Sequence, residues 1–229
     1  MKEQIKKLLL ENGIDEAFAE RLAEYGAMLE ETNRSINLTR ITSAEDIVYK
    51  HFLDSLTAEK YIKKDALVID IGTGGGIPGI PLAIARPDIK ITLLDATENK
   101  INCVKGFAEK LGLKNVSTVW GRAEELAHTE MRGSFDVSVS RAVAPLFILT
   151  EISAGFIKKG GTFISYKGMN AAEEAAQAED IRKKCGLSEF SVKDASVGEF
   201  MHKLVIAEKT GDIPEKYPRS WAKIKKSVK

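Results

Sequence analysis

The pattern of apolar and polar residues separates a helical first quarter of the chain from an alternating remainder. In the first quarter, apolar residues recur about every 3.6 positions, which predicts three helices. The recurring residues are Ile5, Leu8 and Leu9 in the first helix, Phe18, Leu22, Tyr25 and Leu29 in the second, and Val48, Phe52 and Leu56 in the third. We expect a loop over residues 33–42, with Thr42 or Ser43 as the cap of the third helix.

From residue 66 onward, short apolar runs alternate with helical segments. We expect strands at 66–71, 89–95, 116–120, 135–139, 160–166, 187–193 and 202–208, and helices at 79–86, 97–111, 145–157 and 171–184. Apolar strands separated by helices form a parallel sheet with helices on both faces. Residues 194–199 are too few for a parallel crossover, so the last two strands should be antiparallel neighbours.

The fold class that follows is α/β, with a Rossmann-like, seven-stranded and mostly parallel sheet. This arrangement is common among methyltransferases that depend on S-adenosylmethionine. The predicted organisation is a helical extension over residues 1–64, the sheet-bearing domain over 65–210 and a basic tail over 211–229.

The most informative segment is residues 67–79, which read LVIDIGTGGGIPG. An apolar strand ends near Asp70, a turn containing Gly72, Gly74 and Gly76 follows, and an apolar helix begins. Glycine lets a ligand approach bare backbone and tolerates a positive φ. The spacing also fits the dinucleotide fingerprint, because Asp95 stands about twenty residues on, where a ribose-binding acid belongs.

The position of Asp70 favours one ligand over the other. A carboxylate at the strand tip would repel the pyrophosphate of a dinucleotide, which needs a helix N-terminus free of negative charge. S-adenosylmethionine carries a sulfonium and an ammonium group and no phosphate, so an acidic tip suits it. An ordinary turn without a ligand is disfavoured, because clustered glycines lose extra entropy on folding.

Residues at the ends of the next strands add candidates. Asp95 could accept hydrogen bonds from two ribose hydroxyls, or it could cap the following helix. Ala123 and Glu124 could contact the adenine edge, or they could form a surface turn. Arg141 is the strongest candidate for a functional side chain, because an arginine at a sheet tip is costly to shield unless it meets an anion or a planar base.

His51 and Asp54 lie three positions apart and would share one face of the third helix. They could edge the cofactor pocket or form a polar pair within the helix. Both interpretations remain open at this point.

Composition places the chain among soluble globular proteins. Of its 229 residues, 44% are hydrophobic and 29% are charged, and no apolar run is long enough to span a bilayer. Cys103 and Cys185 are far apart and are expected to be small buried hydrophobes. We therefore expect a cytoplasmic protein without a membrane or metal partner, acting as a monomer. The net charge is +1, but the last sixteen residues are basic and could bind phosphates or form a solvated end.

Several motifs together resemble the ribosomal RNA small-subunit methyltransferase G family, also called glucose-inhibited division protein B. They are Asn37-Leu38-Thr39, residues 51–56 (HFLDSL), residues 70–81, Arg122-Ala123-Glu124, Ser140-Arg141-Ala142, Tyr166-Lys167-Gly168 and Lys216-Tyr217-Pro218-Arg219. The resemblance covers most of the chain. Two departures stand out: many members have an arginine where this chain has His202, and the ending after Arg219 differs.

The resemblance implies a bacterial enzyme that methylates N7 of a guanine in 16S rRNA, near the decoding centre of the small ribosomal subunit. It implies that Gly72, Ile77, Ala123, Glu124 and Arg141 contact the cofactor. Arg122 and Arg141 are expected to matter for activity, and S-adenosylmethionine is the implied methyl donor.

The residues also limit the chemistry. The Asn/Asp-Pro-Pro-aromatic motif of amino-directed base methyltransferases is missing, and neither cysteine stands where a cytosine C5 enzyme needs one. The main alternative is a methyltransferase for small molecules on the same fold. A nicotinamide dehydrogenase and a non-enzymatic RNA-binding module are further alternatives, the first disfavoured by Asp70 and the second by the glycine loop.

Overall fold

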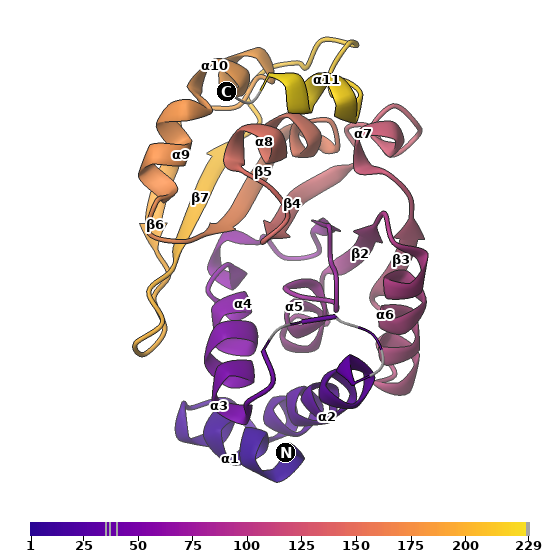
Figure 1. The fold of residues 1–229 in the computed structure, drawn as a ribbon, viewed down its shortest axis with the longest axis vertical. Helices are drawn as coiled ribbons and strands as arrows, with labels where there is room; N and C mark the ends of the chain where they lie inside the picture. Colours follow the sequence, from indigo (N-terminus) through magenta and orange to yellow (C-terminus); the bar gives the residue numbers. More distant parts are fainter. Residues whose placement is uncertain (35, 37, 40, 228–229) are drawn as a thin grey trace.

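The computed structural model describes residues 1–34, 36, 38–39 and 41–227, and it contains one seven-stranded sheet (Figure 1). The strands are β1 Leu67–Ile71, β2 Lys90–Asp95, β3 Val116–Trp120, β4 Phe135–Arg141, β5 Ile157–Lys167, β6 Ser191–Asp194 and β7 Lys203–Glu208. Their order is β3-β2-β1-β4-β5-β7-β6. The first five strands are parallel, and β7 runs antiparallel to both β5 and β6. The predicted sheet and its antiparallel final pair are confirmed.

Helices cover both faces of the sheet. They are α5 Gly79–Ala85, α6 Glu98–Lys110, α7 Ala123–Leu126, α8 Leu146–Ala154, α9 Ala171–Gln177, α10 Glu179–Lys184 and α11 Trp221–Lys226. Strand residues alternate between the faces: Val68 packs in a core with α5 and α6, whereas its neighbour Ile69 packs in a core with α7, α8 and α11. The carboxyl ends of β1, β4 and β5 meet at one edge, where an open α/β sheet binds its ligand.

The N-terminal extension packs on the same face as α5 and α6. It begins with α1 Lys2–Glu11 and α2 Glu16–Asn33, whose buried Ile5 and Leu22 belong to the same apolar core as Val68. The extension and the sheet therefore share one core.

The third predicted helix is not regular. It consists of α3 Ala44–Asp46, the π-helical turn η1 Ile47–Leu53 and α4 Asp54–Leu56, followed by the 3-10 turn η2 Glu59–Tyr61. Ser43 is its cap, because its Oγ accepts a hydrogen bond from the amide of Asp46 at 3.0 Å. The sequence did not predict this π-helical turn, because apolar residues spaced four apart can share one face of either an α-helix or a π-helix. Such π turns are frequent at functional sites.

Other predicted boundaries were wrong. The helix expected over 145–157 ends at Ala154, and the strand expected over 160–166 already begins at Ile157. The helix expected over 171–184 is divided at Ala178, which lets Ala171, Ala178 and Ile181 all reach the core around Phe163. The strand expected over 187–193 begins only at Ser191. The carbonyl of Leu187 accepts a hydrogen bond from the side chain of Arg182 at 2.6 Å instead of from a neighbouring strand.

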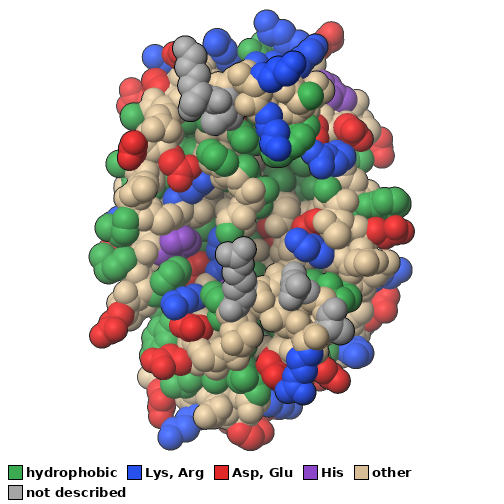
Figure 2. Space-filling view, viewed as in Figure 1, with side chains coloured by type: hydrophobic (Ala, Val, Ile, Leu, Met, Phe, Trp, Pro, Cys, Tyr) green, Lys and Arg blue, Asp and Glu red, His purple; other side chains and the backbone are tan. Residues whose placement is uncertain are grey.

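The basic tail is packed onto the domain as far as residue 227. The guanidinium of Arg132 donates to the carbonyl of Tyr217 at 2.8 Å, Arg219 pairs with the fully buried Glu151, and Ile224 is buried. Basic side chains gather over α11 at the top of the face in Figure 2. Across the described residues, we find no helix that is both long and apolar enough to cross a membrane.

Candidate active site

A cleft of about 1280 Å³ opens at the carboxyl edge of the sheet. The glycine loop that follows β1 forms one wall, Arg141 and Ala142 at the end of β4 form the middle, and the residues that end β5 or precede β7 form the far wall. Thr39 and His51 from the extension also line it. The cleft is therefore built by both the sheet and the extension.

The glycine loop presents bare backbone to this cleft. Gly72 and Gly74 have φ values of +70° and +59°, the left-handed region that glycine adopts without strain. A side chain at Gly74 would meet only open space, with the Gly72 carbonyl 3.9 Å away. Ile77 continues the same wall. This open approach fits the nucleoside part of a methyl donor.

Asp70 lies beneath the loop and is fully buried. Its Oδ2 accepts hydrogen bonds from the Thr73 hydroxyl at 2.7 Å and from the amide of Gly79 at 2.9 Å. Its Oδ1 is buried and has no partner among the described residues. Burial raises the pKa of Asp70 to about 7, partly offset by these hydrogen bonds. The side chain therefore orders the loop from beneath, and it is not among the described residues that line the cleft.

Asp95 braces the same loop from the neighbouring strand. Its Oδ2 accepts from the amide of Gly74 at 3.0 Å, and its Oδ1 accepts from the amide of Thr97 at 2.9 Å, just before α6. One oxygen of Asp95 therefore accepts a hydrogen bond at the start of the following helix, as the helix-cap alternative expected. Contact with ribose hydroxyls stays a prediction.

Arg122, Ala123 and Glu124 form a separate cluster at the start of α7. Ala123 and Glu124 are buried, and Arg122 Nε donates to Glu124 Oε1 at 2.9 Å. The guanidinium of Arg122 also lies 5.2 Å from the ring centre of Trp221 in α11, a cation–π arrangement. These residues are not among those that line the cleft in the described structure.

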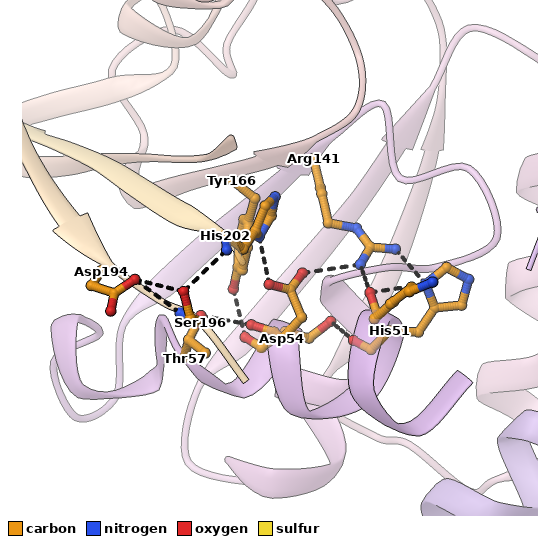
Figure 3. A network of polar contacts seen from close by, with 10 residues as sticks. His51, Asp54, Thr57, Arg141, Tyr166, Asp194, Ser196 and His202 are labelled. Carbon is orange, nitrogen blue, oxygen red and sulfur yellow. Dashed lines mark hydrogen bonds and ion pairs between the residues drawn. The ribbon is translucent and has the colours of Figure 1, made fainter. Parts of the chain in front are cut away.

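Arg141 lies in the cleft and joins the sheet to η1 (Figure 3). Its Nη1 donates to Asp54 Oδ2 at 3.1 Å and to the carbonyl of Lys50, and its Nη2 bonds with His51 Nδ1 at 2.8 Å. Ala142, the next residue, has φ of +55°, which costs an L-residue about 1–2 kcal/mol. Backbone strain of this kind, in a residue other than glycine with positive φ, is most frequent at functional sites.

The contacts of His51 fix its protonation. Burial, followed by the charge of Arg141, lowers the pKa of His51 to about 3, so the ring is neutral. A guanidinium can only donate, so Nδ1 accepts from Arg141. The remaining proton is then on Nε2, which donates to the Thr39 hydroxyl at 2.9 Å. His51 edges the cleft, as one of the two sequence interpretations proposed.

Asp54 is the centre of the network. It is fully buried, and its second oxygen, Oδ1, accepts from His202 Nδ1 at 2.6 Å. Asp54 therefore joins Arg141 and His202 rather than forming a local pair with His51 (Figure 3). The charge that Arg141 brings into the sheet edge is balanced by a carboxylate, which explains how an arginine can be held there.

The structure brings Gly72, Gly74, Ile77 and Arg141 together around the cleft. Asp70, Gly76 and Asp95 lie behind or beside the loop; Gly76 has φ of +97° and packs against Ile80. Phe200 was missed by sequence reasoning, and His202 was singled out only as a departure from the family, yet both line the cleft. Asn37, from the quoted motif 37–39, lies outside the described residues.

The family profile described as rRNA small subunit methyltransferase G matches residues 19–202. The chain belongs to this family. The "Ribosomal RNA small subunit methyltransferase G" of Clostridium perfringens (strain 13 / Type A) is 40% identical over 210 residues, covering 88% of this chain and 87% of the relative. The family resemblance and the methyltransferase class expected from the sequence are thereby confirmed.

Solved structures support the fold. A SAM-dependent methyltransferase from Aquifex aeolicus is similar with a TM-score of 0.57 and 16% identity, covering 81% of this chain and 98% of that one. TYW2 of M. jannaschii, solved in complex with AdoMet, gives a TM-score of 0.54 at 15% identity over 70% of this chain and 77% of its own. The Rossmann-like methyltransferase fold is confirmed. Within the described residues, no group of three or more His, Cys, Asp or Glu side chains could hold a metal ion.

Proposed function

We propose that this protein transfers a methyl group from S-adenosylmethionine to N7 of a guanine in the 16S rRNA of the small ribosomal subunit. The observation that carries the proposal is the bare glycine loop on the wall of a large cleft, in a chain that belongs to the rRNA small subunit methyltransferase G family. The choice of N7 and of 16S rRNA rests on the family resemblance.

The loop residues Gly72 and Gly74, with Ile77, would hold the nucleoside part of the cofactor by backbone contact. The placing of Asp95 at the ribose rests on its position at the end of β2, and the placing of Ala123 and Glu124 at the adenine edge rests on the family resemblance, because none of the three lines the cleft in the described structure. When bound, S-adenosylmethionine supplies an electrophilic methyl group on a sulfonium.

Guanine N7 carries a lone pair in the plane of the ring, on the edge that faces the major groove. It needs no general base, so the protein has only to orient the acceptor. Orientation alone can supply about 7–11 kcal/mol of a reaction barrier. An arginine that gripped N7 would block the lone pair. Nη1 and Nη2 of Arg141 instead bond to Lys50, Asp54 and His51, so Arg141 would act by shaping the cleft.

The basic surface of α11 supports a large anionic partner. Lys223, Lys225 and Lys226 are exposed, and Lys225 Nζ lies 5.6 Å from the ring centre of Trp221. Lysines placed in this way can neutralise phosphates of an RNA backbone. An exposed basic helix has no evident use in a methyltransferase that acts on small molecules.

The direct test is incubation of undermethylated 30S particles, and separately of protein-free 16S rRNA, with labelled methyl donor. Mapping of the modified base should give a single 7-methylguanine. Calorimetric titration should detect uptake of S-adenosylmethionine but not of NAD. Methylation of another atom, or no transfer to either RNA substrate, would overturn the proposal.

Arg141 is tested by replacement with alanine. We expect a strong loss of turnover with the fold retained, as checked by circular dichroism. Arg34→Ala, which removes an exposed arginine paired with Glu30 on α2, is the matched control and should leave turnover unchanged. Near-normal turnover in Arg141→Ala would remove the role of this residue.

A further inference from the structure

The cleft is larger than one small ligand requires. Its volume of about 1280 Å³ exceeds the range of about 300–1,000 Å³ that is usual for small-molecule sites. In the sheet order, β4 separates β1 from β5 and β7. Arg141 therefore divides the cleft into a side next to the glycine loop and a side next to the ends of β5 and β7.

The second side has an aromatic wall made by Tyr166, Phe200 and His202, which all line the cleft. The rings of Tyr166 and His202 are stacked, with centres 6.2 Å apart and an angle of 29°. The rings of His202 and Phe200 lie 5.1 Å apart at 31°. Tyr166 and His202 are buried, whereas Phe200 at the end of the row is only half-buried. Phe200 can thus offer a ring to a planar group.

Residues 49–55 of the extension hold the wall in place. The Tyr166 hydroxyl donates to the carbonyl of Ser55 at 2.5 Å, and His202 Nδ1 donates to the buried Asp54. Phe200 belongs to a tight turn in which it pairs with Val197 across Gly198. The tip of this turn packs against the Tyr49 ring of η1, because a Cβ at Gly198 would lie 3.2 Å from it. The wall is therefore preorganised; its members Tyr166 and His202 are seen beside Asp54 in Figure 3.

We propose that the side of the cleft between Arg141 and this aromatic wall receives the acceptor base, a purine turned out of the RNA and stacked on Phe200. The assignment deepens the proposed function and rests on it. Proteins that read unpaired RNA commonly stack bases on aromatic side chains, and enzymes that modify a base take it out of its stack. Asp54 and His202 are positioning residues: Asp54 accepts hydrogen bonds from both Arg141 and His202, and so fixes Arg141 relative to the wall.

The test replaces Phe200 with alanine and with tryptophan. Loss of one base stack should lower kcat/KM for undermethylated 30S particles about tenfold to a hundredfold in Phe200→Ala, mostly through KM. Phe200→Trp should retain most of the activity. Met201→Ala is the matched control, because its neighbouring side chain is 52% exposed and does not line the cleft in the described structure.

A second measurement separates base binding from cofactor binding. The dissociation constant for S-adenosylmethionine, measured by calorimetry, should change less than twofold in Phe200→Ala. A 16S rRNA fragment with 2-aminopurine at the target position should fluoresce less in its complex with the parent protein, where the base stacks on Phe200, than in its complex with Phe200→Ala. The positioning role predicts that Asp54→Asn lowers kcat/KM for undermethylated 30S particles while the dissociation constant for S-adenosylmethionine changes less than twofold, whereas a purely structural role would weaken both.

The outcomes distinguish the two proposals. If the parent protein methylates 16S rRNA and Phe200→Ala behaves like Met201→Ala, the base site is wrong and the proposed function stands. Weaker cofactor binding in Phe200→Ala with an unchanged KM for RNA would also overturn the base site. If the parent protein methylates neither 30S particles nor 16S rRNA, the proposed function itself fails.

Discussion

The Tyr25 hydroxyl donates a hydrogen bond to the carbonyl oxygen of Gly75 at 2.6 Å, which joins α2 of the extension directly to the glycine loop. Tyr25 is fully buried, and its ring stacks on Phe52 with centres 5.5 Å apart. The extension is thus a structural support of the glycine loop.

Replacement of Tyr25 with phenylalanine leaves the buried carbonyl of Gly75 without this partner. We expect a loss of about 1–3 kcal/mol in the free energy of unfolding, together with weaker binding of S-adenosylmethionine. Urea denaturation and calorimetry measure the two effects. Tyr61→Phe, in η2, is the control and should change neither quantity. If Tyr25→Phe binds the cofactor as tightly as the parent protein, the loop does not depend on the extension.

Gly79 begins α5 where there is no room for a side chain. A Cβ there would lie 2.2 Å from Leu93 Cδ2 and 2.8 Å from Asp70 Oδ2. Gly79→Ala should therefore lower the free energy of unfolding by about 1–3 kcal/mol. In contrast, a Cβ at Gly106 in α6 meets nothing within 4 Å, so Gly106→Ala should stabilise the protein by roughly 0.5–1 kcal/mol. Equal effects of the two substitutions in chemical denaturation would contradict this steric argument.

Burial of Asp70 should appear as a pH dependence of stability. Its pKa is raised from 3.8 to about 7 in the folded state. Between these values the folded protein holds a proton that the unfolded chain has released, so this group's contribution to stability falls as pH rises from about 4 to about 7 and is constant above. The slope is roughly 1.4 kcal/mol per pH unit where the difference is one full proton.

Asp70→Asn should remove this part of the pH dependence. The amide oxygen can still accept from Thr73 and Gly79, so the loop keeps both hydrogen bonds. Urea denaturation at pH 5, 6, 7 and 8 gives the difference between the two proteins, which should grow in favour of the variant up to about pH 7. Parallel curves for the two proteins would show that Asp70 does not titrate in this range.

The lysines of α11 should control the salt dependence of RNA binding. Alanine at Lys223, Lys225 and Lys226 should reduce the slope of log K against log salt concentration by about 2 if all three contact phosphates. The matched control replaces Lys60, Lys63 and Lys64, which are exposed. They lie near the amino end of β1, whereas the cleft lies at the carboxyl ends of the strands. Filter binding to 16S rRNA at several salt concentrations measures the slope, and equal slopes for the two triple variants would exclude α11 from the contact.

The sheet was predictable because its central strands are buried on both faces and read as continuous apolar runs, as at Val68 and Ile69. The widened turn around Lys50 was not predicted. The carbonyl of Lys50 accepts a hydrogen bond from Arg141, some ninety residues away in the sequence, and a local pattern does not contain such a contact. Strand and helix ends at Ala178 and Leu187 likewise depend on tertiary contacts that local patterns do not contain.

The site was predictable where backbone conformation demands a residue type, as at Gly72 and Gly74. The burial of Asp70 beneath its loop was not predictable, because a carboxylate at a strand end can turn toward the ligand or away from it. The aromatic wall also escaped prediction, because Tyr166 and His202 become neighbours only when β5 and β7 pair.

Asp54 and His202 are 148 positions apart in the sequence, yet they share one of the shortest polar contacts in the cleft. A contact between residues this far apart can form only after the whole intervening chain has been synthesised. During synthesis, the glycine loop leaves the ribosome long before His202 does. The glycine-loop side of the cleft is therefore synthesised first, whereas the side lined by Phe200 and His202 can be completed only after those residues have been added to the chain.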